Sequence, residues 1–188
     1  MLSLQALLVS TGTVTLAEIG DKTQLLAILL ATRFRKPMPI ILGILAATLA
    51  NHALAALLGA TVAGIFQSGW FRTLVALSFI AMALWTLIPD KIDDLEDKPA
   101  RFGAFLTTLI AFFLVEMGDK TQIATVALGA RFQAVGWVTL GTTLGMLIAN
   151  IPAVFLGHEL IRRAPLKVVR LVAALMFAAI GLWLLIQG

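Results

Sequence analysis

Long apolar runs, separated by short polar stretches, make up most of this chain. They cover roughly residues 4–32, 38–66, 71–89, 101–130, 135–158 and 167–187. A helix needs about 20 apolar residues to cross a membrane, so each run is long enough for one crossing. The first, second and fourth runs are longer still, and we expect them to be tilted, broken or both. The pattern predicts an all-α integral membrane protein with six transmembrane helices.

The longest polar stretch, PDKIDDLEDKPAR, separates the third apolar run from the fourth. We interpret residues 90–100 as an acidic cytoplasmic linker between a first three-helix repeat, residues 1–89, and a second, residues 101–188. The repeats would together form one integrated domain. The acidic side chains of the linker are those of a solvated loop or, alternatively, gather cations at a cytoplasmic mouth.

One motif occurs twice, as AEIGDKTQ from residue 17 and as VEMGDKTQ from residue 115. A shift of 98 residues superimposes the copies, and the same shift aligns Arg33 with Arg131, Gly43 with Gly141 and Trp85 with Trp183. The match then requires a one-residue slip to bring Asn51 onto Asn150. Because each copy has an odd number of helices, the second enters the membrane from the opposite side. The halves are therefore predicted to be inverted repeats, as in many secondary transporters.

Basic residues predict the orientation, because short cytoplasmic loops are enriched in Lys and Arg. The loops after the first, third and fifth runs carry Arg33, Arg35, Lys36, Lys91, Lys98, Arg101, Arg162, Arg163, Lys167 and Arg170. The opposite side has only Arg72 and Arg131. Both termini are therefore predicted to lie outside the cytoplasm.

Composition supports a membrane protein, since 60% of the residues are hydrophobic and 13% are charged, against about 45–50% and 25% in soluble domains. The net charge of +4 reflects these loop residues, so no nucleic-acid partner is expected. The chain has no cysteine, which excludes disulfides and thiolate metal sites. The N-terminus has no basic segment before its apolar run, and we interpret it as the start of the first mature helix. Trp85 and Trp183 are expected to be interface anchors.

Four carboxylates lie near the middle of apolar runs, namely Glu18, Asp21, Glu116 and Asp119. A charged side chain at the bilayer centre costs roughly 2.5–3.5 kcal/mol on insertion scales, so such residues are functional candidates by default. In a continuous helix, the two acids of each motif would share a face. Inverted symmetry would then bring up to four carboxylates to one point at the midplane.

Protons or a cation must neutralise such a cluster. Four acids and two lysines sum to −2 when all are ionised, which balances one divalent cation. Competition between protons and metal for the same oxygens is the coupling that an antiporter requires. Oxygen donors suit Mg²⁺, Ca²⁺ or Mn²⁺. Gly20 and Gly118 can loosen the helix and free backbone carbonyls, as in discontinuous transporter helices.

Other polar residues leave alternatives open. Lys22 and Lys120 either tune the carboxylates or contact substrate, and a structural ion pair such as Glu18 with Lys22 is the competing interpretation of the motif. Ligation and interhelical hydrogen bonding are both open for Thr23, Gln24, Thr121, Gln122, Asn51 and Asn150. His52 is a candidate proton relay, although no histidine matches it in the second half.

The duplicated E-x-G-D-K-T motif, with three helices per copy, resembles a family of small cation/proton exchangers that includes Golgi and thylakoid manganese and calcium transporters and a bacterial manganese exporter. The resemblance covers nearly the whole chain. It implies proton-coupled export of Mn²⁺, with Ca²⁺ as the alternative, and no resident cofactor. It carries Glu18, Asp21, Glu116 and Asp119 over as the cation site. The targeting extension of organellar members is missing, so a bacterial inner (plasma) membrane is expected.

An intramembrane protease and a channel are the two alternative classes of function. An intramembrane aspartic protease also has buried aspartates beside glycine, but its two carboxylates share a proton, and four acids with two lysines exceed that need. A channel would conduct without responding to a pH gradient. We therefore expect a transporter rather than an enzyme, with a divalent metal ion and the lipid bilayer as partners, and a homo-oligomer is compatible with the sequence.

Overall fold

The computed structural model describes residues 2–65, 69–88, 102–157 and 166–186, and within these ranges all regular structure is helical. The helices are α1 (Leu2–Glu18), α2 (Lys22–Phe34), α3 (Pro37–Ile65), α4 (Gly69–Thr86), α5 (Ala104–Glu116), α6 (Lys120–Phe132), α7 (Val135–Leu156) and α9 (Leu166–Ile186). The all-α prediction is confirmed for this part of the chain. The acidic linker, residues 90–100, lies outside the described residues.

Two of the three longest apolar runs are broken, as expected. The first is divided into α1 and α2, and the fourth into α5 and α6. Both breaks fall inside the repeated motif. The second long run is not broken, since α3 continues for 29 residues.

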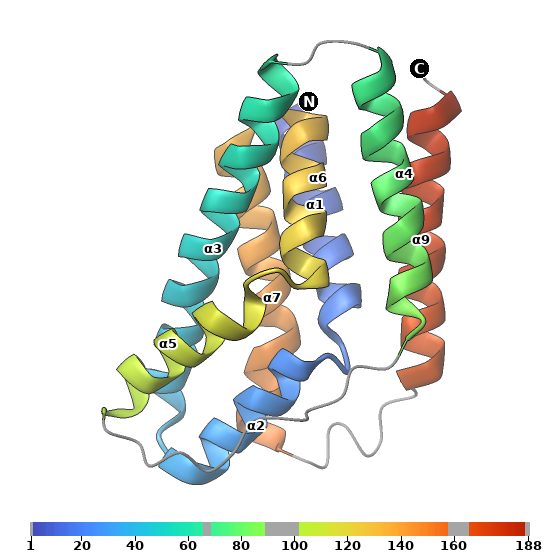
Figure 1. Ribbon diagram of the computed structural model, residues 1–188. Helices are drawn as coiled ribbons and strands as arrows, with labels where there is room; N and C mark the ends of the chain where they lie inside the picture. Colours follow the sequence, from blue (N-terminus) through green and yellow to red (C-terminus); the bar gives the residue numbers. More distant parts are fainter. Residues whose placement is uncertain (1, 66–68, 89–101, 158–165, 187–188) are drawn as a thin grey trace.

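The two halves run in opposite directions (Figure 1). The start of α1 and the end of α9 lie at one end of the bundle; α1 and α2 run away from that end, whereas α5 and α6 run toward it. The halves also interleave, because α1 packs against α7 and α5 packs against α3. This is the arrangement that an inverted repeat produces.

Glycine contacts repeat with the same spacing of 98 residues. A Cβ atom on Gly43 would lie 2.8 Å from the carbonyl oxygen of Phe105, and one on Gly141 would lie 2.6 Å from that of Leu7. Such backbone contact explains why only glycine fits at these two positions. The spacing of 98 residues between equivalent positions holds along α3 and α7, because these helices themselves begin 98 residues apart. The one-residue slip is therefore not needed, and His52, rather than Asn51, corresponds to Asn150.

The exterior of the bundle is apolar, unlike that of a soluble protein. Large apolar side chains face outward, among them Leu54, Leu84 and Ile186, which are 60%, 66% and 83% exposed. The motif acids are buried instead. An apolar exterior around a few buried charged groups suits a lipid environment.

Two helical segments are long and apolar enough to cross a membrane by themselves, Pro37–Ala63 in α3 and Val135–Leu156 in α7. The breaks divide the first and fourth runs into pieces of 17 residues or fewer.

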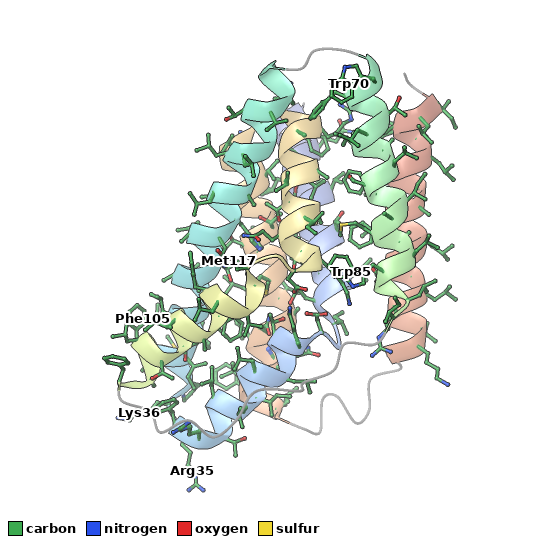
Figure 2. All side chains as sticks on the ribbon, viewed as in Figure 1. Arg35, Lys36, Trp70, Trp85, Phe105 and Met117 are labelled. Atoms are coloured by element: carbon green, nitrogen blue, oxygen red, sulfur yellow. The ribbon has the colours of Figure 1, made fainter. Side chains whose placement is uncertain are left out.

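Arg35 and Lys36 lie at one end of the bundle, opposite the end that carries Trp70 (Figure 2). Many other basic loop residues lie outside the described residues.

Candidate metal centre

Each copy of the motif forms the turn between two half-helices. Glu18 is the last residue of α1, and Asp21 directly precedes α2. Gly20 has φ 82, a left-handed conformation that glycine adopts without steric cost. The backbone N–H of Asp21 donates to the carbonyl of Glu18 at 3.0 Å, which closes the turn.

The second copy repeats this geometry, with Glu116 ending α5, Gly118 at φ 76 and the N–H of Asp119 donating to the carbonyl of Glu116 at 3.1 Å. The expectation that a continuous helical face aligns the two acids is therefore wrong. The helix ends between them, and a tight turn sets their relative positions. The helix does break at the motif glycines, as expected, while the expectation that the break frees backbone carbonyls stays a prediction.

Substituting Gly118 tests this turn. A Cβ atom there would meet nothing within 4 Å, so the cost of Gly118→Ala is conformational, about 1–2 kcal/mol for an L-residue in the left-handed region. We expect G118A to lower both thermal stability in detergent and cation transport. Gly118→Asn is the matched control, because asparagine tolerates this conformation better. Equal damage by alanine and asparagine would contradict this explanation.

Three of the four motif acids converge. One carboxylate oxygen from each of Glu18, Asp21 and Asp119 lies within 4.8 Å of the other two. The three residues are 1%, 4% and 3% exposed. We call these three residues the carboxylate group. It draws on both halves of the chain, and it lies at the helix breaks, close to Met117, which Figure 2 places near mid-height of the bundle.

The aspartates do not cap the helices that they precede. An aspartate at the N-cap ordinarily accepts a hydrogen bond from the first turn, a contact worth about 1 kcal/mol. Neither Asp21 nor Asp119 forms that bond. Both carboxylates turn toward the other half of the molecule instead.

The lysines pair across the two halves. Lys22 Nζ lies 3.2 Å from Asp119 Oδ1, and Lys120 Nζ lies 3.7 Å from Asp21 Oδ1. The competing interpretation placed these ion pairs within one motif, but the structure forms them between motifs. The crossed pairs therefore join the half-helices of the two repeats and partly balance the charge of the carboxylate group.

Both motif threonines donate to the same acid. Thr23 and Thr121 each bond Glu18, and the Thr121 contact is 2.7 Å long and crosses between the halves. These hydrogen bonds fix the orientation of the Glu18 carboxylate. Of the two roles left open for these threonines, hydrogen bonding is present, and metal ligation stays a prediction.

The motif glutamines brace the turns. Gln24 Oε1 accepts from the N–H of Gly20 at 2.9 Å, and Gln122 Oε1 accepts from that of Gly118 at 2.6 Å. Gln24 Nε2 also donates to the carbonyl of Ala149 at 2.9 Å. This bond ties the first turn to α7.

The asparagines differ from each other. Asn51 donates to the carbonyl of Phe113 at 3.0 Å, which is an interhelical hydrogen bond. Asn150 donates to the carbonyl of Met146 in its own helix at 3.1 Å. Its side-chain oxygen is buried and has no hydrogen-bond partner among the described residues.

Glu116 stands apart from the other three acids. It is 1% exposed, and its Oε2 lies 3.5 Å from Nε2 of His52, a fully buried residue of α3. The structure thus places Glu116 opposite an imidazole rather than among the three converging carboxylates.

The contact between Lys120 and Trp85 was not predicted from the sequence. Lys120 Nζ lies 5.9 Å from the ring centre of Trp85, a residue expected only to anchor the interface. The ring therefore flanks the lysine that pairs with Asp21. The recurrence of tryptophan at position 183, at the shift of 98 residues, was the available signal.

Discontinuous helices, inverted halves and buried acids inside an apolar exterior define a membrane ion transporter. The chain belongs to the divalent cation/proton antiporter family GDT1, whose model matches residues 6–94 and again residues 104–188. The two matches correspond to the two repeats. This family is a class of transporter, not of enzyme, and the resemblance found in the sequence is confirmed.

Several relatives support this assignment. The chain is 52% identical over 180 residues to a Vibrio cholerae protein named "Putative manganese exporter", with 95% of this chain and 90% of the relative covered. It is 29% identical to GDT1-like protein sll0615 of Synechocystis, over 90% of this chain and 93% of the relative. It is 27% identical to GDT1-like protein 5 of Arabidopsis thaliana, over 95% of this chain and 94% of the relative. No solved structure matches the chain.

Proposed function

We propose that this antiporter exports Mn²⁺ from the cytoplasm in exchange for protons, and that the metal binds at the carboxylate group, with Glu116 as a fourth acid close by. The observation that carries the proposal is the convergence of three buried carboxylates, from both halves, within 4.8 Å. Oxygen donors of this kind suit Mn²⁺ and Ca²⁺. The name of the Vibrio cholerae relative favours manganese.

Charge balance couples the two ions. The four acids and two lysines sum to −2 when all are ionised, and one divalent cation neutralises that charge. Protons neutralise it equally well in the absence of metal. Because a charged cluster is costly inside a membrane, the site favours one form of compensation at a time, and each ion displaces the other.

We further propose six membrane crossings in a bacterial inner membrane, with both termini outside the cytoplasm. The broken pairs α1–α2 and α5–α6 would each make one crossing. The Lys and Arg residues of the loops after the first, third and fifth runs support this orientation. The crossed ion pairs would then lie near the bilayer midplane.

Transport by purified protein in liposomes tests the proposal. We expect an imposed pH gradient to drive Mn²⁺ uptake, and external Mn²⁺ to drive counterflow of protons. Uptake of Ca²⁺ and Mg²⁺ under the same gradient measures the selectivity. Metal flux that ignores the pH gradient would indicate a channel and would refute exchange.

A further inference from the structure

We propose that His52 is a metal ligand, and that with Glu116 it forms a second cation position beside the carboxylate group. This position combines an imidazole nitrogen with carboxylate oxygens, and it selects divalent transition-metal ions over Ca²⁺ and Mg²⁺. The inference rests on the proposed function, which it deepens by assigning the selectivity to a residue outside the repeated motif.

Burial is the first argument. His52 is fully buried, and Glu116 is 1% exposed. Neither nitrogen of His52 and neither carboxylate oxygen of Glu116 has a hydrogen-bond partner among the described residues. Buried polar atoms are nearly always bonded, since leaving them unpaired costs free energy. Four such atoms on two facing side chains point to a partner that the described residues do not supply.

The distance between the side chains fits a shared ion. Nε2 of His52 lies 3.5 Å from Oε2 of Glu116, longer than an ordinary hydrogen bond. Nitrogen and oxygen ligands of a first-row metal lie about 2.0–2.2 Å from the ion, so two ligands of one ion are roughly 3.0–3.5 Å apart. Small side-chain shifts would bring both atoms to an ion.

The pair adjoins the carboxylate group. The turn that holds Glu116 also holds Asp119, through the 3.1 Å backbone hydrogen bond. Glu18 interacts electrostatically with both Glu116 and His52. The two positions are therefore close enough for their charges to influence each other.

The two halves differ at this point. His52 occupies the position in α3 that Asn150 occupies in α7. Glu18 accepts hydrogen bonds from two threonines, whereas Glu116 faces the imidazole. The nitrogen donor is thus confined to one side of an otherwise repeated arrangement, which points to a function that the symmetric oxygen ligands do not supply.

Ligand chemistry identifies that function. Ca²⁺ and Mg²⁺ take oxygen ligands, while imidazole binds divalent transition metals, with an affinity that rises along the series beginning with Mn²⁺. The carboxylates alone would accept all of these ions. An added imidazole raises the affinity for transition metals without benefit to Ca²⁺.

The first test is transport by full-length protein in liposomes at one fixed pH gradient. His52→Asn gives the α3 position the residue that α7 carries. We expect it to lower the ratio of Mn²⁺ to Ca²⁺ uptake by about tenfold or more, the scale of effect typical of residues that tune a metal site. Asn51→Ala is the matched control: it removes a partly buried hydrogen bond at the adjacent residue and should leave this ratio unchanged. If H52N lowers the uptake of both ions in equal proportion, His52 is merely structural and the proposal is overturned.

The second test does not depend on transport, so it separates a failure of this inference from a failure of the proposed function. Pulsed electron paramagnetic resonance of Mn²⁺ added to purified protein detects coupling to ¹⁴N when an imidazole is bound. We expect that coupling in the wild type and its loss in H52N. Bound Mn²⁺ without nitrogen coupling would refute the assignment of His52 alone, whereas no bound Mn²⁺ at millimolar concentration would refute the proposed function together with it.

Discussion

Glu18→Gln, Asp21→Asn and Asp119→Asn are each expected to reduce pH-driven Mn²⁺ uptake in liposomes to the background of empty vesicles. Each change keeps the size of the side chain but removes one negative charge from a group whose oxygens lie within 4.8 Å of one another. Outer-shell partners of metal ligands are worth about 10–100-fold in affinity or activity, and loss of a ligand should exceed that. Glu116→Gln is expected to have the same effect.

The control for these variants is Asp94→Asn in the linker, which neutralises an acid outside the carboxylate group. It should retain most of the uptake. Size-exclusion profiles and thermal stability in detergent should show that the four motif variants remain folded. Wild-type uptake by any two of the four would remove the site proposed here.

Lys120→Met is expected to destabilise the protein strongly. Asp21 and Lys120 are 3% and 5% exposed at the side chain, so the variant takes a cation partner from a buried carboxylate. Breaking a buried pair by removing one partner costs about 3–5 kcal/mol. Thermal unfolding in detergent measures the loss, and transport should fall with it.

The equivalent ion pair of the other half, Lys22 with Asp119, provides a comparison for Lys120→Met. The Lys22 side chain is 29% exposed and makes the equivalent contact with Asp119, so Lys22→Met should cost less, because this pair is less completely buried than that of Lys120 and Asp21. The double variant K120M/D21N should recover much of the stability but none of the transport. Equal losses in the two single variants, or no recovery in the double variant, would contradict the account of the crossed ion pairs.

Much of the architecture could be predicted from the duplicated motif alone. One shift of 98 residues aligned both the acids and the glycines of the helix contacts, such as Gly43 and Gly141. The odd number of helices per copy then required inversion, and Figure 1 shows the two halves running in opposite directions. The expectation that acids of the two motifs meet followed from inversion, and three of them converge.

The local geometry could not be predicted in the same way. Spacing of three residues suggests one helical face for Glu18 and Asp21, yet it is equally compatible with a turn closed by a left-handed glycine. Gly20 takes that second option. Each lysine directly follows the aspartate of its own motif in the sequence. The ion pairs between the two halves depend on the three-dimensional arrangement of the turns, so the sequence did not predict them.

The position of His52 illustrates a further limit. Asn51 and Asn150 were aligned because they are identical residues, and this alignment required a one-residue slip. Continuous helices keep the spacing of 98 residues, and the true counterpart of Asn150 is a histidine. A difference between the repeats, rather than a likeness, thus marks the proposed second cation position.

The central claim is that metal and protons displace each other at one group of carboxylates. Proton release on Mn²⁺ binding to the purified, detergent-solubilised protein tests it most directly, with a pH electrode in weakly buffered solution. We predict proton release that saturates with bound Mn²⁺ in the wild type and is reduced in D21N and D119N. Stoichiometric Mn²⁺ binding with no proton release at any pH would contradict the account.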